Sequence, residues 1–208
     1  EVAPEDAGLR SALLRDLARQ KPLDLDALAA AERSWGLAFA VPAYTHDLRA
    51  VAEGTAPVLN IGFVSGRFRA GTGLDHLWPL LMHHGQPSMK VHCYSHNGFD
   101  DAISRRLAGA VDSWTDVSKV DDRTTAEIIH NDGIDILIDL DGHRETGHPK
   151  VFGYRPVPVA LRYLGIPDAV EAQGLDGVLA GSFCLPVESP QAAVVDGGLA
   201  ALSPDLKP

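Results

Sequence analysis

The fold is decided by residues 134–167, IDILIDLDGHRETGHPKVFGYRPVPVALRYLGIP. The run from Ile134 to Leu140 is apolar except for Asp135 and Asp139, which predicts a strand buried on both faces of a parallel sheet. A second apolar run, Val157–Leu164, predicts another buried strand. Because ligands bind at the carboxyl ends of strands in open α/β sheets, the turns after these two runs are the first candidates for a site.

Both turns contain glycine: Asp141-Gly142-His143 follows the first run, and Gly165-Ile166-Pro167 follows the second. Asp139 and Asp141 lie on one face of their strand, because side chains alternate with a period of two. Two interpretations are open for this pair. The carboxylates form a paired acidic site, or they cap a turn or helix, which is the commoner role of an aspartate at a strand end.

From Val58 onward, strand and helix signals alternate, which predicts an α/β lobe with a mainly parallel sheet and helices on both faces. The expected strands are Val58–Val64, Lys90–Ser95, Thr115–Val117, Ile134–Leu140, Val157–Leu164 and Gly177–Ala180. The expected helices are Asp75–His84, Asp100–Val111 and Arg123–Asn131. Gly133 suits the position just after the last of these helices, where a positive φ is common.

Two helices are expected before the α/β lobe, Asp6–Gln20 and Leu25–Ala40, with Asp24 or Asp26 as the N-cap of the second. A single helical pair cannot bury its own apolar faces, so the pair packs on the lobe or on further helical repeats. The expected organisation is therefore a helical segment, residues 1–57, followed by a lobe and linker, residues 58–208.

Composition limits the partners and the location. The formal net charge of −10 argues against nucleic acid or an anionic membrane, because phosphate groups are bound by clustered Lys and Arg. No apolar run approaches the ~20 residues that cross a bilayer. The chain starts with acidic residues and not with a signal peptide, and its two cysteines give no disulfide framework, so a cytoplasmic protein is expected.

Several motifs occur together in one order: Asp132–Leu140, Gly142-His143, Phe152, Arg155–Val159 and Leu164-Gly165 with Pro167, preceded by Ile61–Ser65, Phe68 and Val91–Ser95 and followed by Asp176–Leu179. In order and spacing, these motifs resemble the catalytic region of the O-linked N-acetylglucosamine transferases, glycosyltransferase family 41. The resemblance covers roughly residues 58–207. It implies one Rossmann-like lobe of a two-lobed, glycosyltransferase B-type fold, with the helical segment as a remnant of upstream helical repeats.

The resemblance implies transfer of N-acetylglucosamine from UDP-GlcNAc to a Ser or Thr hydroxyl of a protein acceptor, with no metal and no other cofactor. It implies His130 and His143 as catalytic residues, because they match histidines of the family motifs IHxDGI and GHT. For His130, contact with the helix C-terminus is an equally open interpretation. His143 and His148 have no third or fourth ligand at fixed spacing, so no metal site is expected.

The expected cleft lies where the loops 65–73, 141–144 and 165–168 converge. Its expected lining residues are Ser65, Arg67, His76, Asp141, Gly142, Arg155, Pro156, Gly165 and Pro167.

The chain departs from the family pattern at several polar positions. Arg67 stands where the family motif DFxxH has Asp, and its His falls on Gly71 or is deleted; Arg144 replaces the Thr of GHT, and Ala160 replaces a Gln. The nucleotide-sugar is held mainly by the second lobe in the family, and the chain stops where the first lobe is expected to end.

Two functions therefore remain open. One is the acceptor-side lobe of a transferase, inactive when isolated; the other is a non-catalytic module that binds a partner protein. In a titration with a uridine diphosphate donor, measurable binding would favour the transferase lobe, and no binding would favour the partner-binding module. A dinucleotide enzyme is disfavoured, because no GxGxxG motif is present.

Overall fold

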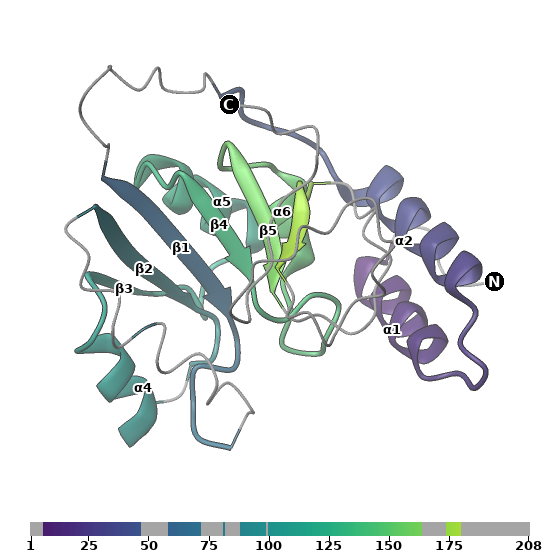
Figure 1. The fold of residues 1–208 in the computed structure, drawn as a ribbon, viewed down its shortest axis with the longest axis horizontal. Coiled ribbons are helices and arrows are strands. Elements are labelled where there is room, and N and C mark those ends of the chain that lie inside the picture. Colours follow the sequence, from purple (N-terminus) through teal and green to yellow (C-terminus); the bar gives the residue numbers. More distant parts are fainter. Residues whose placement is uncertain are drawn as a thin grey trace.

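The computed structural model describes residues 6–46, 58–71, 81, 88–98, 100–163 and 174–179. One sheet organises these residues (Figure 1), with the strand order β3-β2-β1-β4-β5-β6 and parallel pairing throughout. The strands are β1 Leu59–Ser65, β2 Met89–Ser95, β3 Ser113–Asp116, β4 Ile136–Asp139, β5 Val159–Tyr163 and β6 Gly177–Leu179. The predicted parallel sheet is confirmed, and β4 lies in its interior between β1 and β5.

The strand order places a topological switch point between β1 and β4. The chain adds β2 and β3 on one side of β1, and then returns to add β4, β5 and β6 on the other side. This is the order of the doubly wound Rossmann-type sheet, in which a crevice opens at the carboxyl ends of the strands beside the switch point. The loops after β1 and β4 are therefore where a site is expected.

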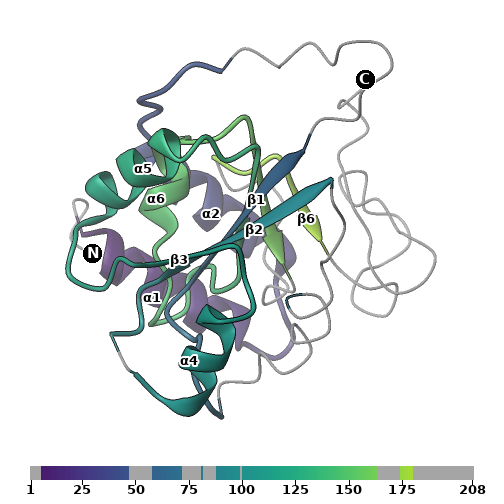
Figure 2. The same cartoon turned by 90° about the vertical axis from the view of Figure 1, so that its left-hand side faces the viewer.

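Alternating side chains bury both faces of the sheet. Phe63 of β1 and Ile138 of β4 are register partners, and both pack in a core cluster with Leu107 of helix α4, Ala102–Ala108. Val64 and Leu137 point to the other face, where they pack with residues of α5, Asp122–Asn131, and α6, Pro149–Gly153. Figure 2 shows α5 and α6 side by side on their face of the sheet.

Local signals set the helix ends. Asp121 caps α5 by accepting a hydrogen bond from the Thr124 N–H, and Gly133 follows the helix with φ +65°, as the sequence predicts. Helix α4 is shorter than predicted and stops at Ala108, because Gly109 forms the C-cap. The five-residue helix α6 was not predicted. The predicted helix 75–84 falls outside the described residues except at Leu81, which is helical.

The predicted helical pair is confirmed as α1, Ala7–Ala18, and α2, Leu25–Phe39, capped by the side chains of Asp6 and Asp24. Leu14 of α1 packs with Leu28 and Trp35 of α2 in a third core cluster. In Figure 1 the pair lies at the β5–β6 end of the molecule, and α4 lies at the opposite end, near β2 and β3. The pair nevertheless reaches the carboxyl ends of the strands through polar side chains.

Candidate functional site

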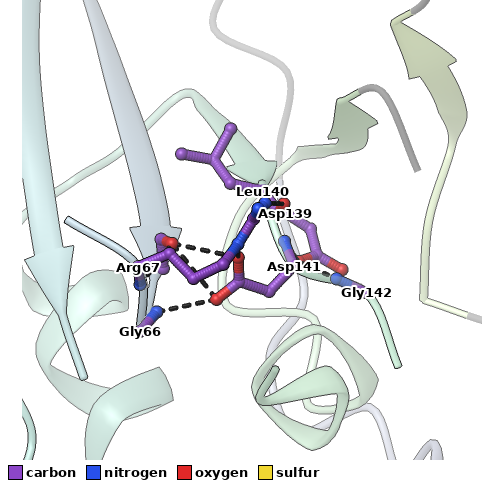
Figure 3. A network of polar contacts seen from close by, with 7 residues as sticks. Gly66, Arg67, Asp139, Leu140, Asp141 and Gly142 are labelled. Carbon is purple, nitrogen blue, oxygen red and sulfur yellow. Dashed lines mark hydrogen bonds and ion pairs between the residues drawn. The ribbon is translucent and has the colours of Figure 1, made fainter. Parts of the chain in front are cut away.

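Asp141 joins the loops that follow β1 and β4 (Figure 3). Its carboxylate accepts hydrogen bonds from Ser65 Oγ at 3.0 and 3.1 Å and from the Gly66 N–H at 2.7 Å. Arg67 Nε lies 2.6 Å from the same carboxylate, and Arg67 also donates to the carbonyl that precedes Asp141, at 2.6 Å. Four predicted site residues, Ser65, Arg67, Asp141 and Gly142, are thus brought together at the switch point.

The ion pair between Arg67 and Asp141 is shielded from water, with side-chain exposures of 17% and 1%. Burial raises the pKa of Asp141, and the hydrogen bond and the charge of Arg67 act in the opposite direction. The carboxylate already accepts from three donor groups. This fits a group that holds two loops together better than one that exchanges protons with a substrate.

Glycines allow close main-chain approach between and within these loops. A Cβ atom at Gly66, after β1, would lie 2.8 Å from the carbonyl oxygen of Thr146, after β4, and a Cβ atom at Gly147 would collide with the carbonyl of Gly142 within the segment after β4. Only glycine fits at positions 66 and 147 without moving the backbone. The switch point is therefore closed by main chain as well as by the ion pair.

Asp139 caps the turn after β4. Its Oδ1 accepts hydrogen bonds from the N–H groups of Asp141, at 2.9 Å, and Gly142, at 2.8 Å. The sequence left two interpretations open for Asp139 and Asp141. The geometry supports the turn cap for Asp139, whereas the Asp141 carboxylate binds the loop after β1. The two carboxylates do not act as a pair, because each is held by its own set of donors.

A buried ionic chain connects this turn to the helical pair. Arg162 of β5 is the register partner of Asp139, and its Nε lies 3.4 Å from Asp139 Oδ2. A second guanidinium nitrogen lies 3.5 Å from a carboxylate oxygen of Glu32 in α2, and the Arg162 and Glu32 side chains are 3% and 0% exposed. The sequence analysis missed both residues. A charged residue within an apolar strand was the available signal for Arg162, whereas Glu32 lies in helix α2, where a charged residue is no such signal.

His143 is buried under the helical pair. Its ring is hydrogen-bonded to Ser11 Oγ at 3.0 Å and packs edge-on against Trp35, with centroids 4.9 Å apart. Arg15 donates to the His143 carbonyl at 2.8 Å. Burial, reinforced by the positive charges of Arg162 and Arg15, lowers the pKa of His143 to about 3. His143 is therefore neutral near pH 7, and its predicted catalytic role stays a prediction that this closed environment does not support.

His130 does not share a site with His143. It occupies the last turn of α5, ahead of the amino end of β4, and its Nδ1 lies 3.2 Å from the carbonyl of Pro156, which precedes β5. Tyr44 stacks on its ring at 4.1 Å. An extended chain rises about 3.3 Å per residue, so β4 places His130 and Asp141 at opposite edges of the sheet. His130 therefore lies away from the loops after β1 and β4, because helix α5 runs antiparallel to the strands, and its catalytic role stays a prediction.

Two other predicted cleft residues, Arg155 and Pro156, also lie at this amino edge. Arg155 has the left-handed φ of +52°, pairs with Asp176 at 2.6 Å and accepts a contact from His46 on its carbonyl at 2.8 Å. These contacts hold a strained backbone between α6 and β5. The remaining three predicted residues, His76, Gly165 and Pro167, lie outside the described residues.

A stacked histidine pair lies beyond the switch point. The rings of His96, after β2, and His148, before α6, are 3.4 Å apart between centroids and nearly parallel, and His148 Nδ1 lies 2.7 Å from Asp122. Burial, followed by the nearby His148, lowers the pKa of His96 to about 4. Across the described part of the chain, no group of three His, Cys, Asp or Glu residues is arranged to hold a metal ion.

Two cavities flank the closed switch point. One, of about 220 Å³, is lined by residues that include Ser95, Asn97, Trp114 and Asp116 at the carboxyl ends of β2 and β3. The other, of about 340 Å³, lies between α1 and the segment that joins β4 to α6. Both cavities lie beside the Asp141 network.

The fold and the site together define a Rossmann-type α/β lobe with polar loops at its switch point and a docked N-terminal helical pair. The sequence profile of glycosyl transferase family 41 matches residues 37–195, and the chain belongs to that family.

The similar proteins are named as UDP-N-acetylglucosamine–peptide N-acetylglucosaminyltransferases. The chain is 30% identical over 154 residues to a probable UDP-N-acetylglucosamine–peptide N-acetylglucosaminyltransferase, SEC, of Arabidopsis thaliana, covering 72% of this chain and 16% of the relative. It is 28% identical over 173 residues to the SPINDLY protein of Oryza sativa, covering 80% of this chain and 18% of the relative. These curated relatives are thus several times longer than the matched region.

A solved structure supports the fold. A mutant O-GlcNAc transferase from Thermobaculum terrenum superposes with a TM-score of 0.76 and 28% identity, covering 88% of this chain and 35% of that one. The described helices include none that is both long and apolar enough to cross a membrane.

Proposed function

We propose that the chain is the acceptor-side lobe of the catalytic region of a protein O-GlcNAc transferase. In this proposal the complete enzyme transfers N-acetylglucosamine from UDP-GlcNAc to Ser or Thr hydroxyls of a protein acceptor, with no metal or other cofactor. The observation that carries the proposal is the family match over residues 37–195, which spans both loops of the switch point. A cytoplasmic location and upstream helical repeats remain predictions from the sequence.

In this proposal the residues of this chain hold the loops of the site in position and do not themselves react with the substrate. The Asp141 network holds the two loops together. The ionic contacts of Arg162 with Asp139 and Glu32 hold the helical pair against these loops. Precise positioning of this kind contributes to catalysis, because misplaced loops lose the geometry that the reaction requires. The donor and the second lobe would approach from the carboxyl edge of the sheet.

A binding module without catalysis is the second candidate, and two observations favour it. His143, one of the two predicted catalytic histidines, is buried and neutral, and His130 lies at the far edge of the sheet. Neither histidine is therefore within hydrogen-bond reach of a substrate beside Asp141.

A lobe exchange tests the proposal. Residues 6–179 would replace the matching lobe of the Thermobaculum terrenum O-GlcNAc transferase, and transfer from labelled UDP-GlcNAc to Ser/Thr peptides would be measured by mass spectrometry. The 208-residue chain alone should give no transfer, whereas the hybrid should transfer sugar.

The control is the same hybrid carrying Arg67→Gln, which uncouples the loops while leaving the donor lobe intact. It should fold, bind the donor and transfer more slowly than the parent hybrid. A well-folded parent hybrid that binds UDP-GlcNAc but transfers nothing would reject the transferase proposal and support the binding module.

A further inference from the structure

The 340 Å³ cavity between the helical pair and the lobe contains an excess of positive charge. Three cationic side chains line it: Arg15 of α1, Arg144 from the segment that joins β4 to α6, and Lys150 of α6. Two acidic residues, Asp122 and Glu145, line it as well. The lining therefore has one more positive than negative charge, although the whole chain carries a net charge of −10.

The cations in this cavity are not neutralised by the acids beside them. Neither Arg144 nor Lys150 makes a side-chain hydrogen bond or ion pair with any of the residues that the structure describes, although both are half-buried. Among the described residues, the hydrogen bond that Arg15 donates goes to a main-chain carbonyl, that of His143. The Asp122 carboxylate contacts another residue, His148, whose Nδ1 lies 2.7 Å from Asp122 Oδ1. Partly desolvated cations that lack an anionic partner favour the binding of an external anion.

The remaining walls of the cavity suit an organic body better than a bare ion. Trp35 and Pro149 contribute apolar surface, and Ser11 adds a hydroxyl group next to the buried His143. A volume of about 340 Å³ falls in the range of sites for small ligands, which combine apolar walls with a few polar groups.

We propose that this cavity binds an organic oxyanion, a carboxylate or a phosphate monoester. Its charged oxygens are held by Arg144 and Lys150, with support from Arg15, and its apolar part lies against Trp35. Arg144 stands where the family motif GHT has a threonine. The site is separate from the Asp141 network, and it does not depend on the proposed transferase activity.

The test is an NMR titration of the 208-residue chain with phenyl phosphate. Benzoate would represent the carboxylate class, inorganic phosphate the bare ion, and phenol the uncharged body. The Trp35 indole N–H is the reporter, because Trp35 lines this cavity, whereas Trp114, the other tryptophan that the structure describes, lines the 220 Å³ cavity. Phenyl phosphate or benzoate should shift this resonance with a Kd of about 1–10 mM, and phenol should bind more weakly.

Matched variants decide between a site and general attraction. Arg144→Gln and Lys150→Gln should each weaken binding of the organic anion about three- to tenfold, because each removes a charge-assisted hydrogen bond. Arg123→Gln removes the same charge from an exposed position of α5 and should change the Kd less than about twofold.

Any one of four results would overturn the proposal. The first is an indole resonance that does not move with either organic anion. The second is phenol binding as tightly as phenyl phosphate. The third is an equal loss of affinity in Arg123→Gln and Arg144→Gln. Binding of inorganic phosphate as tight as that of phenyl phosphate would also reject the organic body and leave a bare-ion site.

Discussion

Acidification should destabilise the protein through His143. The unfolded chain takes up a proton on this histidine near its ordinary pKa of about 6.5, whereas the folded protein does so only near 3. The unfolded state therefore binds more protons between these values. Stability that is fully present above pH 6.5 is lost as the pH falls through this window.

The magnitude follows from linkage. Each such histidine makes the unfolding free energy depend on pH by up to about 1.4 kcal/mol per pH unit, which amounts to about 2 kcal/mol between about pH 7 and pH 5. His96 has a folded pKa of about 4 and should add a similar loss over most of the range. The measurement is urea unfolding, followed by circular dichroism, at half-unit pH steps.

Variants isolate the His143 contribution. The Asn side chain of His143→Asn cannot be protonated and keeps a polar partner for Ser11. The unfolding free energy of this variant should therefore depend less steeply on pH, with a slope that corresponds to about one fewer proton taken up on unfolding. His96→Asn should reduce the slope independently, because the two histidines lie in separate contacts. If His143→Asn kept the slope of the parent protein, the ring of His143 would not be held neutral in the fold.

Three substitutions probe the sheet and the switch point. Ile138→Ala, in the buried strand β4, should cost about 2–5 kcal/mol in chemical unfolding, and an unchanged midpoint would contradict its burial. Arg67→Gln leaves a buried carboxylate without its cation and should cost about 3 kcal/mol, whereas Arg105→Gln, from an exposed ion pair, should cost under about 1 kcal/mol; equal costs would refute the shielded pair. Gly147→Ala should destabilise the protein by about 1–3 kcal/mol, because its Cβ atom would collide with the carbonyl of Gly142. Gly109→Ala, whose Cβ atom would make ordinary contacts, should leave the midpoint of the same thermal melts nearly unchanged.

The apolar runs and the positions of glycine in the sequence predicted much of the sheet. The apolar run that contains β4 showed that this strand is interior, and Gly133 marked the end of α5 because a left-handed φ suits glycine. Helix α6 was missed, because five residues give no helical periodicity to detect.

The candidate site was predicted less completely than the fold. The clustering of Ser65, Arg67 and Asp141 followed from strand ends, which a sequence indicates well. The covering of His143 by Ser11 depends on a contact between residues 132 positions apart, and no local pattern encodes it. The sequence left the position of His130 open, because the family motif indicates a residue type and not the edge of the sheet on which it lies.

The buried link between Glu32 and Arg162 has a consequence for any attempt to divide or recombine this chain. The boundary predicted at residue 57 separates the helical segment from the lobe in the sequence, but a fragment that starts there would leave Arg162 and His143 without their helical partners. Such a fragment should be insoluble or only partly folded when expressed. In an exchange between relatives, the helical pair should therefore be inherited together with Asp139, His143 and Arg162, as one module whose seam runs through the interior of the protein.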